Sequence, residues 1–201
     1  MYQLAKAPLS ANSFIKSDRY NRWHQGIDDS TAILMGHTRY PTQGSHLNNY
    51  NNQPLLSAPE QPVLLTHNGH IPESQHILES MGLPRELEVD SEVLLRMACC
   101  SLGPAGFSIG RLLSNVRACP GQIAAVFVTP VNSDEIILVR RERPLFLAYN
   151  NEKQLLAYAS EQQILTSAVY DNGWHISRIP AFMAVVVHRH HDLATTQYSL
   201  T

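Results

Sequence analysis

Residues 36–45 of this 201-residue chain have the sequence GHTRYPTQGS, and residues 67–69 have the sequence HNG. An apolar run, Ala32 to Met35, precedes the first segment, and another, Val63 to Leu65, precedes the second. Short apolar runs followed by polar, glycine-containing residues predict two buried strands that each end in a turn. Rigid strands that present polar loops are a common way to build a small-molecule site. The two turns are therefore the candidate functional site.

The polar residues of these turns have chemistry suited to small-molecule binding. Arg39 can grip a carboxylate through two parallel hydrogen bonds, and Thr42 adds a hydroxyl group. Asn68 offers a side-chain amide, and Gly69 offers a backbone N–H that no side chain obstructs. An amide NH2 beside a free N–H can stabilise an oxyanion.

The motifs GHTRYPTQG and HNG are similar to those of the class II glutamine amidotransferase domain, a member of the N-terminal-nucleophile (Ntn) hydrolases. That family shows GH-x-R-[WYL]-[AP]-T-x-G, then HNG, then D-[ST]-E, and this chain has Asp90-Ser91-Glu92 in the third place. Ser160-Glu161 resembles a later family motif, so the resemblance spans roughly residues 32–187. It implies an α+β fold, a four-layer α-β-β-α sandwich of two antiparallel sheets.

The family reaction implied by the resemblance is hydrolysis of the side-chain amide of L-glutamine to L-glutamate and ammonia, without a cofactor. A thiolate attacks the amide carbon, and the free α-amino group of the same cysteine acts as the base. The site residues that the resemblance implies are an oxyanion hole at Asn68 and Gly69, α-carboxylate binding at Arg39 and Thr42, α-ammonium binding at Asp90, and a further substrate-binding residue at His67.

Two of these residues also have structural explanations. Asp90 is a good N-cap for a helix over Val93 to Leu102, with Glu92 in its first turn, and the sequence does not separate this role from ammonium binding. His67, like His37, follows a predicted core strand, which is typical of a buried, hydrogen-bonded support for a loop.

The nucleophile of the family is a cysteine at the first position of the mature chain. This chain begins Met1-Tyr2-Gln3, and no cysteine occurs before Cys99. We therefore expect the N-terminal strand region to be incomplete and the chain alone to be inactive. Whether the protein is an enzyme stays open. It is either an incomplete glutaminase, with its nucleophile upstream or on a separate polypeptide, or a non-catalytic pseudoenzyme that binds glutamine, another amino acid or a partner. A structural relic is a third, weaker interpretation.

Length and composition predict a single globular domain over residues 1–201, with 44% apolar and 16% charged residues. The net charge of −2 gives no reason to expect a nucleic acid or an anionic membrane as partner. No apolar run approaches the ~20 residues of a membrane span. The start, MYQLAKAPLS, lacks the apolar block of a secretory signal, so a cytoplasmic location is the simplest expectation. An ammonia acceptor, a synthetase or transferase, would need a partner chain.

Ten histidines raise the question of a metal site. Neither the pair His67 and His70 nor the cluster His188, His190 and His191 has helical H-x-x-x-H spacing or a cysteine partner, and we expect no metal.

Three cysteines, an odd number, argue against a disulfide framework. Cys99 and Cys100 are predicted to be buried in an apolar helix. Cys119, before Pro120 and Gly121, is predicted to be a surface thiol in a turn.

The remaining pattern predicts a short strand within 1–9, a helix from Ser10 to Gly26, and a strand over Thr31 to Gly36 that delivers His37 and Arg39. Residues 44–62 form a long Asn-rich loop, in which Asn52-Gln53-Pro54 resembles a family segment near the glutamine pocket. Further helices are predicted at 71–81, 106–116 and 160–169, the last capped by Ser160, and further strands at 123–128, 135–139, 144–149, 155–159, 174–179, 182–188 and 195–200, the first four as a meander.

Overall fold

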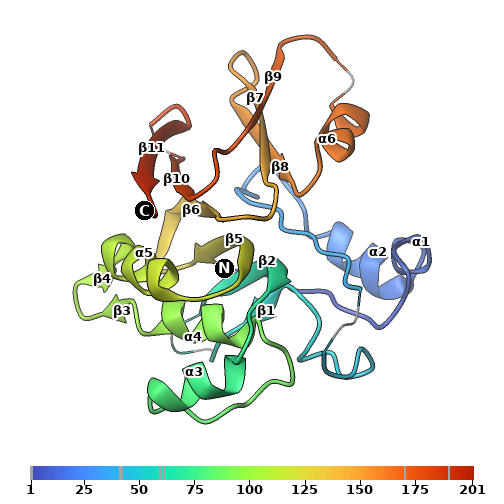
Figure 1. Ribbon diagram of the computed structural model, residues 1–201. Coiled ribbons are helices and arrows are strands. Elements are labelled where there is room, and N and C mark those ends of the chain that lie inside the picture. Colours follow the sequence, from blue (N-terminus) through green and yellow to red (C-terminus); the bar gives the residue numbers. More distant parts are fainter. Residues whose placement is uncertain (1, 41–42, 59, 61, 170, 190) are drawn as a thin grey trace.

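The computed structural model describes residues 2–40, 43–58, 60, 62–169, 171–189 and 191–201, and within them the chain has an α+β fold with antiparallel sheets (Figure 1). The largest sheet has the strand order β1-β2-β5-β6-β10-β11, and every neighbouring pair is antiparallel. Its strands are β1 (Leu55–Leu56), β2 (Leu64–His70), β5 (Gln122–Thr129), β6 (Asn132–Arg140), β10 (Met183–His188) and β11 (Ala194–Ser199).

A second sheet has the order β8-β7-β9, with β7 at Phe146–Asn150, β8 at Leu155–Ala159 and β9 at Trp174–Arg178. A two-stranded hairpin of β3 (Leu102–Gly103) and β4 (Gly106–Phe107) forms a third ladder, which pairs with neither sheet. The predicted strands 123–159 exist, but the prediction of one meander is wrong, because the chain leaves the first sheet after β6. Pro144 follows this break, and proline has no N–H with which to continue a ladder.

Three of the predicted helices agree closely with the structure. They are α3 (Ser74–Ser80), α5 (Ile109–Ala118) and α6 (Gln162–Ala168), although Glu161, not Ser160, is the N-cap of α6. The fourth, α4 (Glu92–Cys99), is N-capped by Ser91 without a side-chain hydrogen bond, so the prediction that Asp90 caps it is wrong.

The predicted helix from Ser10 to Gly26 is wrong as a single element, because it is divided into α1 (Ala11–Phe14) and α2 (Asp18–His24). The hydroxyl of Ser17 donates to the Phe14 carbonyl at 2.6 Å and accepts from the Tyr20 N–H at 3.2 Å. One serine thus ends the first helix and begins the second.

Three hydrophobic clusters form the core. The first lies between one face of the large sheet and α3, α4 and α5, with members such as Leu65, Phe127, Leu78, Leu94 and Leu112. The second uses the other face of that sheet and side chains of β7 and β8, with members such as Val126, Leu138, Val185, Leu147 and Tyr158. The third joins the small sheet to α6 through residues such as Ala148, Ala159 and Leu165.

The N-terminal quarter contributes little to this core. None of the described residues from 2 to 50 is buried, and α1 and α2 (blue) stand apart from α3, α4 and α5 (green) in Figure 1. Residues 2–9 contain no strand, which contradicts the prediction. No helix in the described part of the chain is long and apolar enough to cross a membrane.

The predicted strand over Thr31 to Gly36 is also absent. Residues 32–40 nevertheless alternate between half-buried and exposed side chains, and Met35 packs against the second cluster. None of their backbone groups hydrogen-bonds to the backbone of another described residue. The segment has the side-chain alternation of a strand but no neighbouring strand with which to pair, which is why the strand is not formed.

Candidate functional site

The HNG motif lies inside β2, and the prediction that a turn contains it is wrong. The ladder with β5 continues to the end of β2, pairing His67 with Ala125, Asn68 with Ala124 and Gly69 with Ile123. Gly69 permits this close pairing, because a Cβ there would lie 1.8 Å from the carbonyl oxygen of Gln122. Glycine is therefore required at this position for β2 and β5 to pair.

Asn68 and His67 lie on opposite faces of the large sheet. Asn68 is opposite Ala124 of the second cluster, so its exposed side chain is on the face toward the small sheet. His67 is opposite Ala125 of the first cluster and is 3% exposed. Its Nδ1 lies 2.9 Å from Ser91 Oγ, and burial lowers its pKa. His67 is buried and hydrogen-bonded, as predicted, but it lies within β2 and does not follow the strand.

Asp90 is buried near the end of β2, where its carboxylate accepts a hydrogen bond from the backbone. Its Oδ2 accepts a hydrogen bond from the Ile71 N–H at 2.7 Å and lies 3.3 Å from His70 Nδ1. The carboxylate is close enough to Arg39 to favour the charged guanidinium, since it opposes the lowering of the Arg39 pKa by burial. Asp90 therefore places negative charge close enough to Arg39 to stabilise its guanidinium.

Arg39 is half-buried and donates to the loop that follows it. Its Nη1 donates to Asn52 Oδ1 at 3.2 Å, and its Nη2 donates to the carbonyls of Gly44, at 3.0 Å, and Gln43. His37, two residues earlier, has its pKa lowered to about 4, first by burial and then by His67 and Arg39. His37 is therefore a neutral imidazole at pH 7.

The segment Asn52-Gln53-Pro54 ties the long loop to β2. The Gln53 side chain accepts a hydrogen bond from the His67 N–H and donates to the His67 carbonyl at 3.0 Å. The Gln53 side chain thereby extends the row of hydrogen bonds along this edge of β2, where β1 pairs with Leu64 and Leu65. This segment therefore lies beside the strand that carries HNG.

Three residues of this region had no signal in the sequence analysis. Lys6 donates from Nζ to the carbonyls of Asn52 at 2.8 Å and Pro54 at 3.3 Å, and burial lowers its pKa to about 8. Asn51 is fully buried, and its Nδ2 donates to Glu88 Oε2 at 2.6 Å. The Asn-rich composition gave no reason to prefer Asn51, and nothing in the sequence links Lys6 or Glu88 to this loop.

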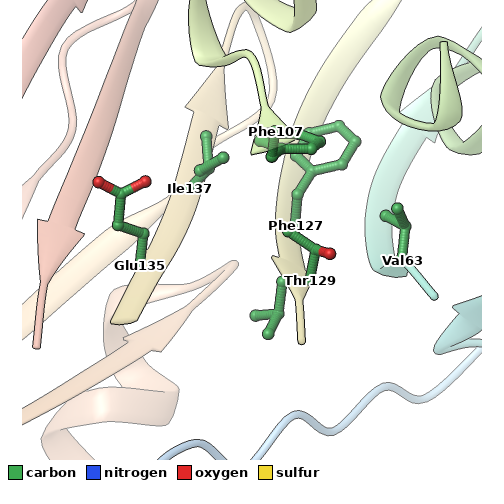
Figure 2. A pocket seen from close by; sticks show the side chains of 7 residues that line it. Val63, Phe107, Phe127, Thr129, Glu135 and Ile137 are labelled. Atoms are coloured by element: carbon green, nitrogen blue, oxygen red, sulfur yellow. The ribbon is translucent and has the colours of Figure 1, made fainter. Parts of the chain in front are cut away.

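Thr42 lies outside the residues that the structure describes. The remaining predicted site residues gather around the end of β2: Asn68 and Gly69 on the strand, Arg39 on the extended segment beside the Asn52 loop, and Asp90 after the strand. Figure 2 shows a small hollow elsewhere, between β5, β6 and the β4 hairpin, and its lining contains none of these residues.

The thiols lie away from Asn68. Cys119 belongs to the first cluster and is 1% exposed, so the prediction of a surface thiol is wrong. Burial raises the pKa of Cys119 to about 11 and also raises that of Cys99. Cys100 is exposed, contrary to prediction, because it is the C-cap residue of α4 and lies beyond the apolar face of the helix.

Among the described residues, no group of three or more His, Cys, Asp or Glu side chains is arranged to hold a metal ion. His188 instead lies 3.1 Å from Glu135 Oε1 and 2.9 Å from Thr196 Oγ1. His190, which the sequence analysis grouped with His188, is outside the described residues.

Comparison with known proteins finds distant sequence similarity to two curated enzymes. No family model matches the chain. Over 121 residues it is 31% identical to glutamine–fructose-6-phosphate aminotransferase of Mycobacterium leprae, covering 57% of this chain and 19% of that protein. Over 129 residues it is 27% identical to the enzyme of the same name from Xanthomonas campestris pv. campestris, covering 63% of this chain and 20% of that protein.

Two solved structures share the fold of this chain. The glutamine phosphoribosylpyrophosphate amidotransferase of B. subtilis superposes with a TM-score of 0.62 at 21% identity, covering 82% of this chain and 34% of that chain. A structure described as the allosteric regulatory enzyme of purine biosynthesis gives a TM-score of 0.62 at 20% identity, with the same coverage of 82% and 34%. The chain is therefore similar to class II glutamine amidotransferase domains, distantly in sequence and more extensively in fold.

This amidotransferase-like domain corresponds to only part of its relatives. It spans about a fifth of the length of the two curated enzymes and about a third of the two structures. At these identities the structural likeness establishes the fold, and the activities of the longer proteins are not transferred by it.

Proposed function

We propose that this domain binds L-glutamine and is the glutaminase part of a class II amidotransferase whose nucleophile is supplied by a segment other than residues 1–201. The observation that carries the proposal is the end of β2, where Asn68 and Gly69 lie near a guanidinium, Arg39, and a buried carboxylate, Asp90. An α-amino acid carries one negative and one positive group, and Arg39 and Asp90 complement both.

The arrangement of the core supports the Ntn-hydrolase architecture as part of this proposal. The first cluster joins helices to the large sheet, the second joins the two sheets, and the third joins the small sheet to α6. These contacts support the four-layer order α-β-β-α that we propose. Asn68 is then on the face between the two sheets.

In the proposed reaction a thiolate attacks the side-chain amide carbon of glutamine. The oxyanion that forms is stabilised by the Asn68 amide and the Gly69 N–H. Ammonia leaves, water hydrolyses the thioester, and glutamate follows. The ammonia acceptor in this proposal belongs to a synthetase or transferase region outside this domain.

The chain's own thiols do not suit the role of nucleophile. A thiol reacts as its thiolate, and the raised pKa values of Cys99 and Cys119 keep both protonated at pH 7. Cys119 and the partly buried Cys99 also pack with the helix-side cluster, on the sheet face opposite to Asn68. We therefore expect no ammonia release from glutamine by the 201 residues alone.

Residues 32–40 are where a nucleophile-bearing strand would pair in this proposal. They are extended, one side rests on the second cluster, and their backbone makes no hydrogen bond to the backbone of another described residue. Unpaired backbone beside a half-buried face is a template for an added strand. The added strand belongs either to an upstream segment or to a separate polypeptide.

The test is calorimetric titration of the 201-residue chain with L-glutamine. We expect binding that Arg39→Ala abolishes, whereas Arg22→Ala, an exposed arginine on α2, leaves it unchanged. Asn68→Ala is expected to leave binding intact, because an oxyanion exists only in the transition state. Absence of binding by the unmodified chain, or full binding by Arg39→Ala, would contradict the proposal.

A non-catalytic glutamine-binding module is the second candidate, and the positions of the three thiols favour it. Addition of an extended peptide that begins with cysteine distinguishes the two. Ammonia release that depends on Asn68 supports the glutaminase. Glutamine binding without ammonia release under these conditions supports the binding module.

A further inference from the structure

The guanidinium of Arg39 is already occupied by its own chain. Its Nη2 donates to the Gln43 carbonyl and, at 3.0 Å, to the Gly44 carbonyl. Its Nη1 donates to Asn52 Oδ1 at 3.2 Å. Both terminal nitrogens of the guanidinium are thus engaged by described residues of the loop.

This occupancy decides how a carboxylate can bind. A guanidinium offers two bidentate edges, one formed by Nη1 and Nη2 and the other by Nε and Nη2. Each edge uses Nη2, and Nη2 of Arg39 already donates to the Gln43 and Gly44 carbonyls. An incoming α-carboxylate must therefore compete with these carbonyls for Nη2 in order to form the two-hydrogen-bond pair.

The loop that carries these carbonyls, residues 43–52, is fastened at its other side by Glu88. Glu88 Oε2 accepts hydrogen bonds from the Ser45 N–H at 2.9 Å and from Asn51 Nδ2 at 2.6 Å, and the Glu88 N–H donates to Asn51 Oδ1 at 3.0 Å. Gly44 lies against the same residue, since a Cβ on Gly44 would be 2.7 Å from the Glu88 Cβ. Arg39 and Glu88, of opposite charge, thus hold one loop from two sides.

We propose that Glu88 latches residues 43–52 over Arg39, so that the loop carbonyls compete with the α-carboxylate of glutamine and the latch lowers the affinity of the site. The proposal deepens the proposed function and rests on it for the identity of the ligand. Its physical content is a two-state loop, in which glutamine binds the state with Arg39 released. The apparent affinity then equals the intrinsic affinity multiplied by the fraction of molecules with the loop open.

The first experiment compares Glu88→Ala with the unmodified chain by calorimetric titration with L-glutamine. Removing the latch is expected to tighten binding about tenfold, because the open fraction rises. Glu86→Ala is the matched control, since Glu86 is exposed on the same segment and pairs with Arg96, not with the loop. Gly44→Ala is expected to act like Glu88→Ala, because the added Cβ cannot fit against Glu88. Gly36→Ala is its control, because nothing lies within 4 Å of a Cβ at position 36.

The second experiment needs no glutamine. Phenylglyoxal reacts with accessible guanidinium groups, and its rate of addition to Arg39 is followed by peptide mass spectrometry. We expect faster labelling of Arg39 in Glu88→Ala and Gly44→Ala, and unchanged labelling in Glu86→Ala and Gly36→Ala. Melting temperatures of the four variants show that each remains folded.

The outcomes separate the latch from the function. Faster labelling of Arg39 with no glutamine binding by any chain would overturn the proposed function and support the latch. Glutamine binding that weakens or does not change in Glu88→Ala would overturn the latch and leave the proposed function standing, with the loop as a fixed part of the site.

Discussion

Residues 2–50 and residues 51–201 differ in how they are held. Among the described residues the first buried side chain is Asn51, and every buried member of the three clusters comes from the later region. Residues 2–50 contact residues 51–201 through a few side chains, such as Met35, Arg39 and Lys6. The difference teaches that the proposed site takes its carboxylate-binding residue, Arg39, from the least buried part of the fold.

The largest expected difference between the two regions is in amide hydrogen exchange. The N–H groups of residues 32–40 make no hydrogen bond to the backbone of a described residue, whereas those of β5 and β6 are in the centre of the large sheet. Exchange measured by mass spectrometry is expected to be faster in 32–40 by at least about three orders of magnitude. Similar exchange rates in residues 32–40 and in β5 and β6 would contradict the expected difference between the two regions.

Glycine substitutions give the next largest effect. Gly69→Ala places a Cβ 1.8 Å from the Gln122 carbonyl oxygen, whereas Gly36→Ala meets nothing within 4 Å. We expect Gly69→Ala to lower the free energy of unfolding by about 3 kcal/mol or more, and Gly36→Ala by less than about 0.5 kcal/mol. Urea denaturation followed by circular dichroism measures both, and equal values would contradict the assignment of Gly69 to a tight pairing.

His37 sharpens the comparison, because it is a residue of the early region that is largely withdrawn from water. Its pKa is lowered from 6.5 to about 4, so its neutral form contributes stability that is fully present above pH 6.5 and is lost as the pH falls toward 4. The loss is expected to be at most about 3 kcal/mol. His37→Asn should flatten the dependence of unfolding free energy on pH in this window. If the pH dependence of the unfolding free energy is unchanged in the variant, the His37 imidazole is exposed to water and the prediction is wrong.

The smallest effect expected here belongs to Gln53. Gln53→Leu removes its two hydrogen bonds to the His67 backbone and should cost about 1 to 2 kcal/mol in unfolding free energy. Gln163→Leu, on the exposed surface of α6, is the control and should change it by less than about 0.5 kcal/mol. A loss in Gln53→Leu no larger than in the control would show that water replaces these hydrogen bonds.

The sequence predicted the later region well and the early region poorly, for a physical reason. Amphipathic patterns such as Ile109 to Ala118 report burial, and burial holds the later elements in place. Thr31 to Gly36 has a strand pattern, yet a strand also needs a neighbour for its backbone, which a pattern within one segment does not reveal.

The candidate site was predictable only where a motif marked it. The motifs identified Arg39, Asn68, Gly69 and Asp90, and the structure brings them to one end of β2. Glu88 and Lys6 act through contacts with residues about 40 positions away, Glu88 with Ser45 and Lys6 with Asn52. Cys119 was misplaced because a turn sequence does not tell whether a helix and a sheet close over it.

The hydrogen bonds of Gln53 also bear on how the molecule behaves in concentrated solution. Beyond the two residues of β1, the outer edge of β2 is covered at His67 by a side-chain amide instead of by a strand. A neighbouring polypeptide finds no continuous row of backbone groups there to extend, so this edge is protected against intermolecular sheet growth. The Gln53 carboxamide thus limits the addition of a further strand to this edge of the sheet.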